Sequence, residues 1–333
     1  MRVAILDVGS NSIQLLVADV AGSAWTQVAA GERITRLADG LIHTGRFHPV
    51  AAARTLDALR LFAARARALG AETFSVVGTR PFRMAADAAD LAGRIEAAIG
   101  VPLEILSGAR EAELGFAGAV GGLGCARGPV LTIDIGGGST EIVCGHDGRI
   151  VERVSLPIGA VVLTQRHLEH DPTTAEEVAA LRAAVSAALD GAPPLRRWRG
   201  MGGGPFIGSG GTVTTLAAVG ARLECYRAEV VHGRRLTRDA LEDMCVELAA
   251  RTVSERCAMP GLDPDRAPVI LGGALIAAEA VAAAAAEALV VSDQGLRHGL
   301  LTSRLPEMSA GARHGIDAGA ASSDTPSGGD PQR

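Results

Sequence analysis

The chain has 333 residues, of which 48% are hydrophobic, and a formal net charge of -5. This length and apolar content predict a large buried core, divided between two domains. The mildly acidic balance argues against a protein that holds nucleic acid on a basic face.

The first part of the chain predicts strands that alternate with helices. Such alternation favours a mixed, mostly parallel sheet that helices cover on both faces. Turn residues and hydrophobic periodicity set the boundaries. The predicted elements are a hairpin in AILDVGSNSIQLLV (residues 4–17), a strand at Trp25–Ala30, a helix at Val50–Leu69 entered at Pro49 and stopped by Gly70, a strand at Phe74–Gly78, a segment that ends at Gly100, a strand at Leu103–Leu106 and a helix at about Ala109–Val120.

A glycine-rich stretch at Gly122–Pro129 is the best boundary before the second part of the chain. There the elements are a hairpin in LTIDIGGGSTEIV (residues 131–143), a helix to about Leu189 that Thr174 and Glu177 open as a capping box, a strand, glycine turn and helix at Phe206–Val219, and a buried helix followed by a strand at Val269–Val291. The last of these is too rich in alanine and too interrupted by Glu279 and Glu287 for a membrane span. Residues Ser309–Arg333 have the composition of a disordered tail.

The two hairpins are copies of one unit. AILDVGSNSIQLLV aligns with LTIDIGGGSTEIVC without a gap at an offset of 127 residues, which places Asp7 on Asp134, Gly9 on Gly136 and Ser12 on Ser139. Each copy is a strand, a tight Asp-x-Gly turn and a second strand, so the sequence predicts an internal repeat.

Three glycine turns, DVGSNS, DIGGGS and GSGGT, each follow an apolar strand, where α/β sheets place their ligands. One such turn alone would equally well be a tight hairpin. Three of them, two with an aspartate at matched positions, favour a phosphate-binding cleft between two lobes. A Rossmann site is excluded because DIGGGS leads into a strand rather than a helix.

All 32 basic residues are arginine. Without lysine, a P-loop, a protein kinase site and a Schiff-base enzyme are excluded. The five cysteines include no C-x-x-C pair, which fits reduced thiols in a cytoplasmic protein and argues against zinc. The short apolar run after Arg2 does not have the length of a signal peptide.

The paired turns and the later GSGGT resemble the phosphate motifs of the sugar kinase, heat-shock protein 70 and actin superfamily. More narrowly, the sequence resembles the exopolyphosphatase and guanosine pentaphosphatase family, in its short form. Four segments carry this likeness: GTRPFRMAADAADL (Gly78–Leu91), ILSGAREAELGF (Ile105–Phe116), SLPIGAVVLT (Ser155–Thr164) and SDQGLRHGLL (Ser292–Leu301).

The resemblance implies an α/β fold of two ribonuclease H-like lobes with a phosphate-binding cleft between them. The lobes would span residues 1–122 and 123–305, before a disordered tail at 306–333. It implies a hydrolase that uses Mg²⁺ to remove terminal phosphate from inorganic polyphosphate or from guanosine pentaphosphate (pppGpp). Self-association as a homodimer follows by family analogy only, and neither nucleic acid nor membrane is an expected partner.

The resemblance also assigns residues, and each assignment has a chemical reason. Glu111 would be the catalytic base, although a glutamate in the first turn of a helix is also favoured by the helix dipole alone. Arg83 would grip phosphate through a bidentate fork, with Arg80 and Arg110 as surface charges. Asp134, also counted as catalytic, Asp7 and Glu141 would serve Mg²⁺, because hard cations take oxygen ligands. The phosphate-binding set is Ser10, Asn11, Ser12, Gly136, Gly137, Gly138, Ser139, Gly208, Ser209, Gly210, Gly211 and Thr212.

Two departures and two rivals stay open. Arg110 replaces the family's first acidic residue beside Glu111, and no further helical domain of the HD type follows, so the resemblance does not extend to processive action on long polymers. The first rival is a kinase or ATPase of the same superfamily, with an adenine pocket near GSGGT. The second is a catalytically weak sensor that binds polyphosphate or alarmone.

Overall fold

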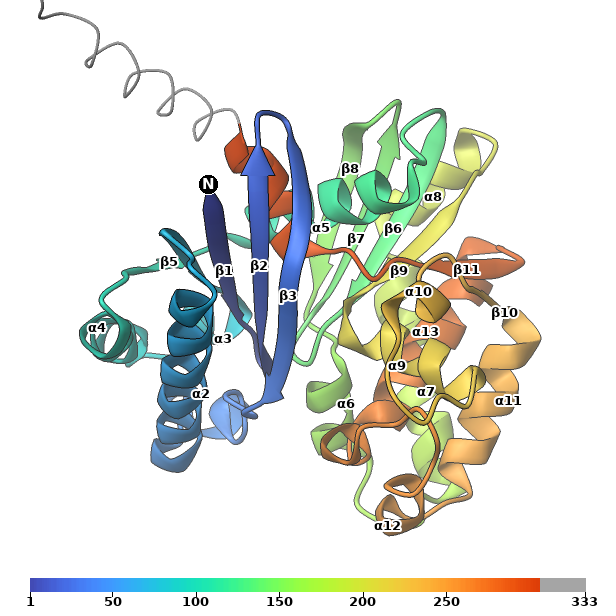
Figure 1. Cartoon of the computed structure of the whole chain (residues 1–333). Helices are drawn as coiled ribbons and strands as arrows, with labels where there is room; N and C mark the ends of the chain where they lie inside the picture. The colour runs from blue at the N-terminus through green and yellow to red at the C-terminus, as the bar shows by residue number, and fades with distance from the viewer. Residues whose placement is uncertain (306–333) are drawn as a thin grey trace, which may run out of the picture.

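The computed structural model describes residues 1–305, which form two lobes, each built on one β-sheet (Figure 1). The first lobe contains β1 (Arg2–Val8), β2 (Ser12–Ala21), β3 (Ala24–Ile34), α1 (Leu41–Thr44), α2 (Pro49–Ala68), β4 (Thr73–Gly78), α3 (Arg80–Met84), α4 (Ala88–Ile99) and β5 (Leu103–Ile105), and α5 (Gly108–Leu123) follows. The second contains β6 (Pro129–Ile135), β7 (Thr140–His146), β8 (Arg149–Leu156), α6 (Ala160–His167), α7 (Ala175–Asp190), α8 (Pro193–Gly200), β9 (Phe206–Ser209), α9 (Gly210–Gly220), α10 (Ala228–Val231), β10 (Arg235–Thr237), α11 (Arg238–Ala249), α12 (Val253–Arg256), α13 (Ile270–Ala284) and β11 (Ala288–Val291).

The two sheets have the same connectivity. The strand order is β3-β2-β1-β4-β5 in the first sheet and β8-β7-β6-β9-β11, extended by β10, in the second. In each, the first three strands pair antiparallel and the next two join in parallel. The predicted mixed sheets and the ribonuclease H-like lobes are therefore confirmed. The sheets are not mostly parallel as predicted, because each hairpin repeat adds two antiparallel strand pairs, and β10 also pairs antiparallel with β11.

The repeated hairpins are equivalent down to their hydrogen bonds. The Gly9 N–H donates to the carbonyl of Ser12 at 2.9 Å, and the Gly136 N–H donates to the carbonyl of Ser139 at 2.9 Å. Across the strands, Asp7 pairs with Gln14 and Asp134 with Glu141. The offset of 127 residues thus repeats one hydrogen-bonded turn.

Most element boundaries follow the expected local signals. Thr174 and Glu177 form the predicted capping box at the start of α7, and Pro49 begins α2. The strand expected at Trp25–Ala30 extends to Ile34, because the whole of β3 pairs with β2. The segment that ends at Gly100 divides into α3 and α4, where Ala85 takes an extended conformation.

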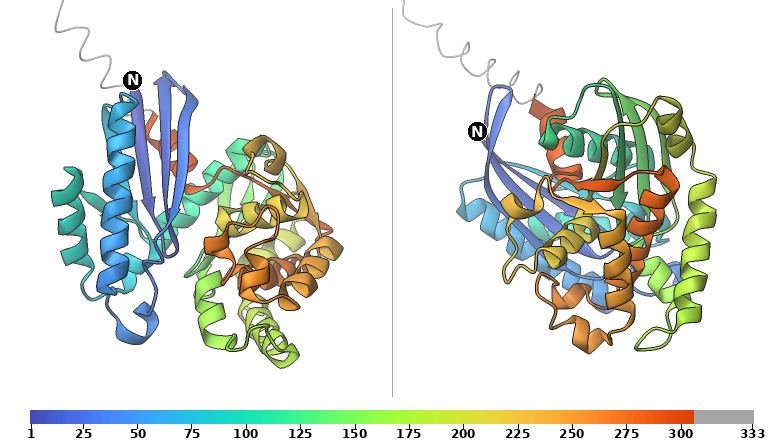
Figure 2. Two further views of the ribbon diagram at one scale, coloured as in Figure 1. Left: turned by 60° about the horizontal axis from the view of Figure 1, so that its bottom comes forward. Right: turned by 90° about the vertical axis from the view of Figure 1, so that its right-hand side faces the viewer.

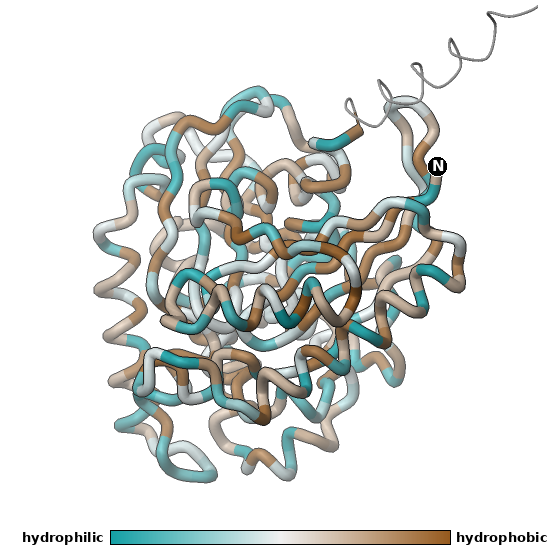
Figure 3. Tube along the Cα trace, turned by 90° about the vertical axis from the view of Figure 1, so that its left-hand side faces the viewer, coloured by the Kyte–Doolittle hydropathy of each residue, from teal (hydrophilic) through white to brown (hydrophobic). Residues whose placement is uncertain are grey.

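Helices cover both faces of the first sheet. The cores on its two faces are separate: Leu56, Leu59 and Phe62 of α2 pack on one face, and Leu300 and Leu301 on the other. Figure 2 (left) shows α2 and α4 on the near side of the strands and the last helix behind them. In Figure 3 the apolar residues gather along the strands, inside the helices.

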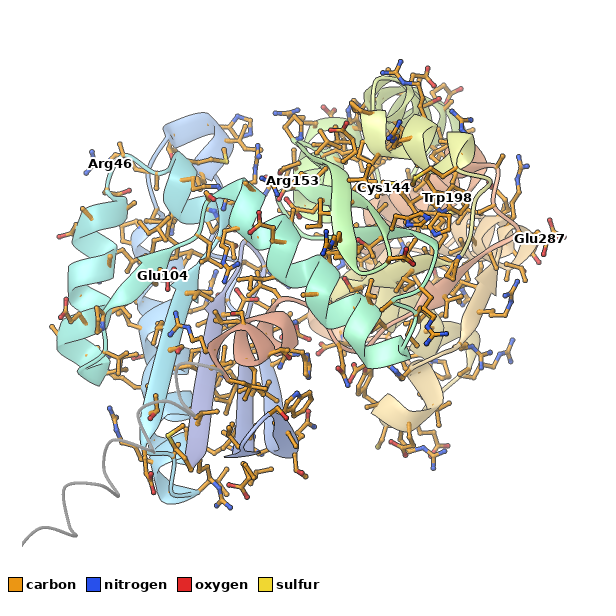
Figure 4. The ribbon with its side chains drawn as sticks, turned by 90° about the horizontal axis from the view of Figure 1, so that it is seen from above. Arg46, Glu104, Cys144, Arg153, Trp198 and Glu287 are labelled. Carbon is orange, nitrogen blue, oxygen red and sulfur yellow. The ribbon has the colours of Figure 1, made fainter. Side chains whose placement is uncertain are left out.

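Two helices that cross each other, α5 and the last described helix, join the lobes. The last described helix, residues 296–305, packs against the first sheet although it follows the second lobe in sequence. The backbones of this helix and α5 lie in close contact. A Cβ at Gly299 would overlap the backbone of Leu114, and a Cβ at Gly118 would overlap the backbone of Gly295. Figure 4 shows α5 running between the lobes, with Glu104 on the first and Cys144 and Trp198 inside the second. A division of the chain at residue 122 stays a prediction.

The apolar segment Val269–Val291 forms α13 and β11, as predicted, and lies in the core of the second lobe. Within residues 1–305, no helix combines the length and apolar character that crossing a membrane requires. The tail predicted from Ser309 lies outside the described residues.

Candidate active site

A cleft of about 930 Å³ lies between the lobes and brings most of the predicted site together. Its walls include Asp7, Ser10, Asn11, Ser12, Glu111, Asp134, Gly136, Gly137, Gly138, Ser139, Glu141, Ser209, Gly210, Gly211 and Thr212. Two predicted residues lie off its walls. Gly208 lies within β9, where its missing side chain makes room for Leu289 and Val213, and Arg83 lies behind Glu111.

The two hairpin turns face each other across this cleft. A Cβ at Gly137 would lie 3.2 Å from Cβ of Asn11, and a Cβ at Gly138 would lie 2.7 Å from the Ser10 hydroxyl. Gly210 has a φ of 87°, and a Cβ there would overlap the Asp134 carboxylate. The glycines therefore allow turns from both lobes to meet around one small space.

The N-terminus of α6 supports the second turn from behind. The Ala160 N–H donates to the Gly136 carbonyl at 3.0 Å, and the Val161 N–H donates to the Gly137 carbonyl at 2.9 Å. A Cβ at Gly159 would lie only 2.5 Å from the Gly137 carbonyl oxygen. The first turn of α6 therefore occupies the carbonyls of Gly136 and Gly137.

Four carboxyl groups with raised pKa values surround this space. Burial, and then the neighbouring Glu111, raise the pKa of Asp7 to about 7. Burial, Glu111 and Asp134 together raise the pKa of Glu141 to about 8. Burial also raises the pKa of Asp134, against a hydrogen bond from the Ser209 hydroxyl at 3.0 Å. The negative charges of these carboxylates repel one another, and too little positive charge lies nearby to offset the repulsion.

Glu111 lies in the first turn of α5, which Ser107 caps. Its Oε2 accepts a hydrogen bond from Nη1 of Arg83 at 2.7 Å, and the same Nη1 donates to the carbonyl of Leu106 at 2.8 Å. Burial raises the pKa of Glu111, while Arg83 opposes that rise. The arrangement fixes one carboxylate oxygen and leaves the other for a reactant.

Arg80 is not the surface charge that the sequence predicts. Arg80 lines the cleft, and its Nε is buried without a hydrogen-bond partner among residues 1–305. Its side chain lies 3.2 Å from the position that a Cβ of Gly138 would take. The positions of Arg80 and Arg83 after Gly78 and Thr79 do not indicate which of the two arginines faces the cleft. The orientation of the short helix α3 determines this.

Ser155 supports the site although its place in the sequence does not predict this. Its hydroxyl donates to Oε1 of Glu141 at 2.8 Å, from the neighbouring strand β8. Arg110, the departure beside Glu111, points away and pairs with Glu113 at 3.4 Å. It therefore leaves the surroundings of Glu111 to Arg83 and Arg80.

The acidic set fits a magnesium ion that takes few protein ligands. Oδ1 of Asp7 is buried without a hydrogen-bond partner in the described chain, which is a position that a cation would satisfy. Within residues 1–305, however, no three acidic, histidine or cysteine side chains lie close enough to complete a metal site. Mg²⁺ commonly uses one or two carboxylates together with water and substrate phosphates, and this set suits that pattern.

Comparison with known proteins agrees with this geometry. The sequence profile of the Ppx/GppA phosphatase family matches residues 16–308. The chain belongs to this family. Exopolyphosphatase 2 of Mycobacterium tuberculosis is 40% identical over 293 residues, which cover 84% of this chain and 89% of that protein.

Solved structures from the same family share the fold. A Ppx/GppA protein of Aquifex aeolicus is 29% identical with a TM-score of 0.76, over 92% of this chain and 98% of that one. An exopolyphosphatase from Cytophaga hutchinsonii is 25% identical with a TM-score of 0.84, over 92% and 98%. The predicted family and its two-lobed actin-like fold are confirmed.

Proposed function

We propose that this protein is an exopolyphosphatase, which hydrolyses the terminal phosphoanhydride bond of inorganic polyphosphate. The observation that carries the proposal is the meeting of two equivalent Asp-x-Gly turns around a cleft that also holds Glu111. The names of the mycobacterial relatives point to the same substrate.

The residues suit this hydrolysis as follows. Amides of Gly137 and Gly138 and the Ser10 hydroxyl would hold oxygens of the terminal phosphoryl group. Glu111 would take a proton from water as the water oxygen bonds to phosphorus. The bridging P–O bond then breaks, and its electron pair leaves with the shortened chain.

Asp134 and Asp7 would hold Mg²⁺ directly or through water, and Glu141, kept in place by Ser155, would orient the surrounding water. Bound Mg²⁺ would neutralise charge on the phosphoryl oxygens. A cation would also relieve the repulsion among the buried carboxylates.

A guanosine polyphosphate is the second candidate substrate. The cleft continues beyond α9, where Leu223, Tyr226 and Leu262 add apolar wall. Tyr226 is exposed, and its hydroxyl donates to Asp293, so the ring is held at the wall. Such a surface suits a nucleoside better than a phosphate chain.

The substrate test is phosphate release with Mg²⁺ from short-chain polyphosphate, long-chain polyphosphate, pppGpp and ATP in parallel. The expected ranking has polyphosphate first. Preference for pppGpp would support the second candidate, and ATP-dependent product formation would support the kinase rival.

We also propose a cytoplasmic protein that binds neither nucleic acid nor membrane and forms a homodimer. The five unpaired cysteines support a reducing compartment. Sedimentation of the full chain at micromolar concentration tests the dimer.

Mg²⁺ affinity should rise with pH in the substrate-free protein. A protonated carboxyl cannot bind the cation, and the pKa of Asp7 is about 7. Calorimetric titration should therefore show affinity about 10-fold weaker at pH 6 than at pH 8.5. Asp7→Asn should flatten this dependence. An affinity that stays constant across the range in wild type would contradict the assignment.

Arg80 and Arg83 should affect different kinetic constants. Arg80→Gln removes a charged donor from the cleft wall and should raise KM for polyphosphate by about 10-fold or more, with kcat little changed. Arg83→Gln releases Glu111 and should lower kcat by about 10-fold, with KM nearly unchanged. Arg94→Gln, on the exposed side of α4, is the control. If Arg83→Gln raised KM instead, the predicted phosphate fork of Arg83 would be favoured.

A further inference from the structure

A set of polar contacts bridges the lobes at the end of β3, apart from the crossing helices. Arg266 pairs with Glu32, Nη2 of Arg36 lies 3.4 Å from Oδ1 of Asp265, and Nε2 of Gln165 donates to Asp39 at 3.1 Å. In Figure 1, the lower end of β3 faces α6 across the gap between the lobes. These contacts connect residues 32–39 of the first lobe to residues 265–266 and α6 of the second.

Arg266 belongs to the cleft rather than to the surface. Its side chain is only 8% exposed. Its guanidinium lies against the first turn of α9, since a Cβ at Gly211 would overlap it. It therefore brings positive charge to the third glycine turn, beside the amides that begin α9.

One carboxylate oxygen of Glu32 accepts three hydrogen bonds. Its Oε1 accepts hydrogen bonds from the Ser12 hydroxyl at 2.7 Å, from the Gln14 amide at 3.1 Å and from Arg266. Burial alone would raise the pKa of Glu32, but Arg266 and the two polar donors lower it to about 2. Glu32 is thus an anion at neutral pH.

A carboxylate is an unusual group on the wall of a cleft that binds polyanions, because like charges repel. Ser12 is a donor of the first phosphate turn, and Arg266 is the cation at the third, so Glu32 occupies groups from both sides of the cleft. A phosphoryl oxygen of the substrate would accept hydrogen bonds from the same Ser12 and Arg266 donors, and its negative charge would repel the Glu32 carboxylate. Glu32 and the phosphoryl group therefore cannot bind these donors at the same time.

We propose that Glu32 is a placeholder anion. Without substrate, it holds the two lobes together through Arg266; when substrate binds, a phosphoryl group replaces Glu32 as the partner of Ser12 and Arg266. The identity of that ligand rests on the proposed function, whereas the contact between the lobes does not. Arg36 and Asp265 form a second pair with the charges reversed between the lobes. That pair is exposed and contributes little.

The test compares Glu32→Gln with Arg36→Gln, each of which breaks one pair between the lobes. Glu32→Gln should tighten pyrophosphate binding, measured by calorimetry in EDTA, by about 5- to 10-fold, and should lower KM for short-chain polyphosphate by a similar factor. Arg36→Gln should leave both values within about twofold. Should Glu32→Gln not fold, Glu32→Thr suits the edge strand and carries the same expectation.

Weaker or unchanged pyrophosphate binding in Glu32→Gln would overturn the placeholder. An equal gain in Arg36→Gln would also overturn it, because loosening of the lobes would then explain the effect. If wild type released no phosphate from polyphosphate, the proposed function would fail, but the pyrophosphate comparison would still decide the role of Glu32.

Discussion

Glu111→Gln should lower kcat for phosphate release from polyphosphate by about 10³-fold, within the range that a general base contributes. The amide keeps the shape of the side chain but cannot accept the proton from water. Burial raises the pKa of Glu111, and Arg83 opposes that rise.

The matched control is Glu113→Gln, two residues further along α5. Glu113 forms exposed ion pairs with Arg110 and Arg153 and faces away from the cleft. Its replacement should leave kcat within about twofold. Equal loss of kcat in both variants, or no loss in Glu111→Gln, would remove Glu111 from the mechanism and leave only its favourable place at a helix N-terminus.

Asp134→Asn should reduce kcat/KM by about 10³-fold while it stabilises the metal-free protein. Asp134 is buried, and its pKa is raised, so its charged form opposes folding. Because the folded state holds that proton more tightly than the unfolded state, stability falls as pH rises through the raised pKa. The neutral amide removes this loss and can still accept the Ser209 hydrogen bond.

Thermal unfolding in EDTA at pH 5 and pH 8 tests this second effect. The Tm of Asp134→Asn should exceed that of wild type at pH 8 by about 2–4 °C, the shift that about 1 kcal/mol produces in a domain of this size, and by less at pH 5. The control is Asp147→Asn. Asp147 accepts the Gly128 N–H at 2.8 Å and has a lowered pKa, so its replacement should lower Tm and leave kcat unchanged. A lower Tm in Asp134→Asn would contradict the picture of uncompensated charge.

Local patterns predicted much of this fold. The Asp-x-Gly turns at Asp7 and Asp134, the capping box at Thr174 and the glycine stop after α2 are short-range signals, and the structure has all of them. The cleft could also be predicted, because strands with equivalent turns end at equivalent places in repeated sheets.

Contacts between distant segments could not be predicted in this way. The choice of Arg80 over Arg83 for the cleft depends on the orientation of α3, which no spacing in the sequence reveals. Glu32 and Arg266 are 234 residues apart, and neither lies in a motif, so only the packing of the two lobes brings them together. The last helix likewise returns to the first sheet, because its leucines complete a core begun some 290 residues earlier.

The most direct test of hydrolysis in this cleft is the reaction of short-chain polyphosphate with Mg²⁺ in ¹⁸O-labelled water. Attack of water on the terminal phosphorus should place one solvent oxygen in every released phosphate and none in the shortened chain, and Glu111→Gln should release almost none. Label in the shortened chain, or transfer of the phosphoryl group to an acceptor other than water, would contradict an exopolyphosphatase acting at the chain end.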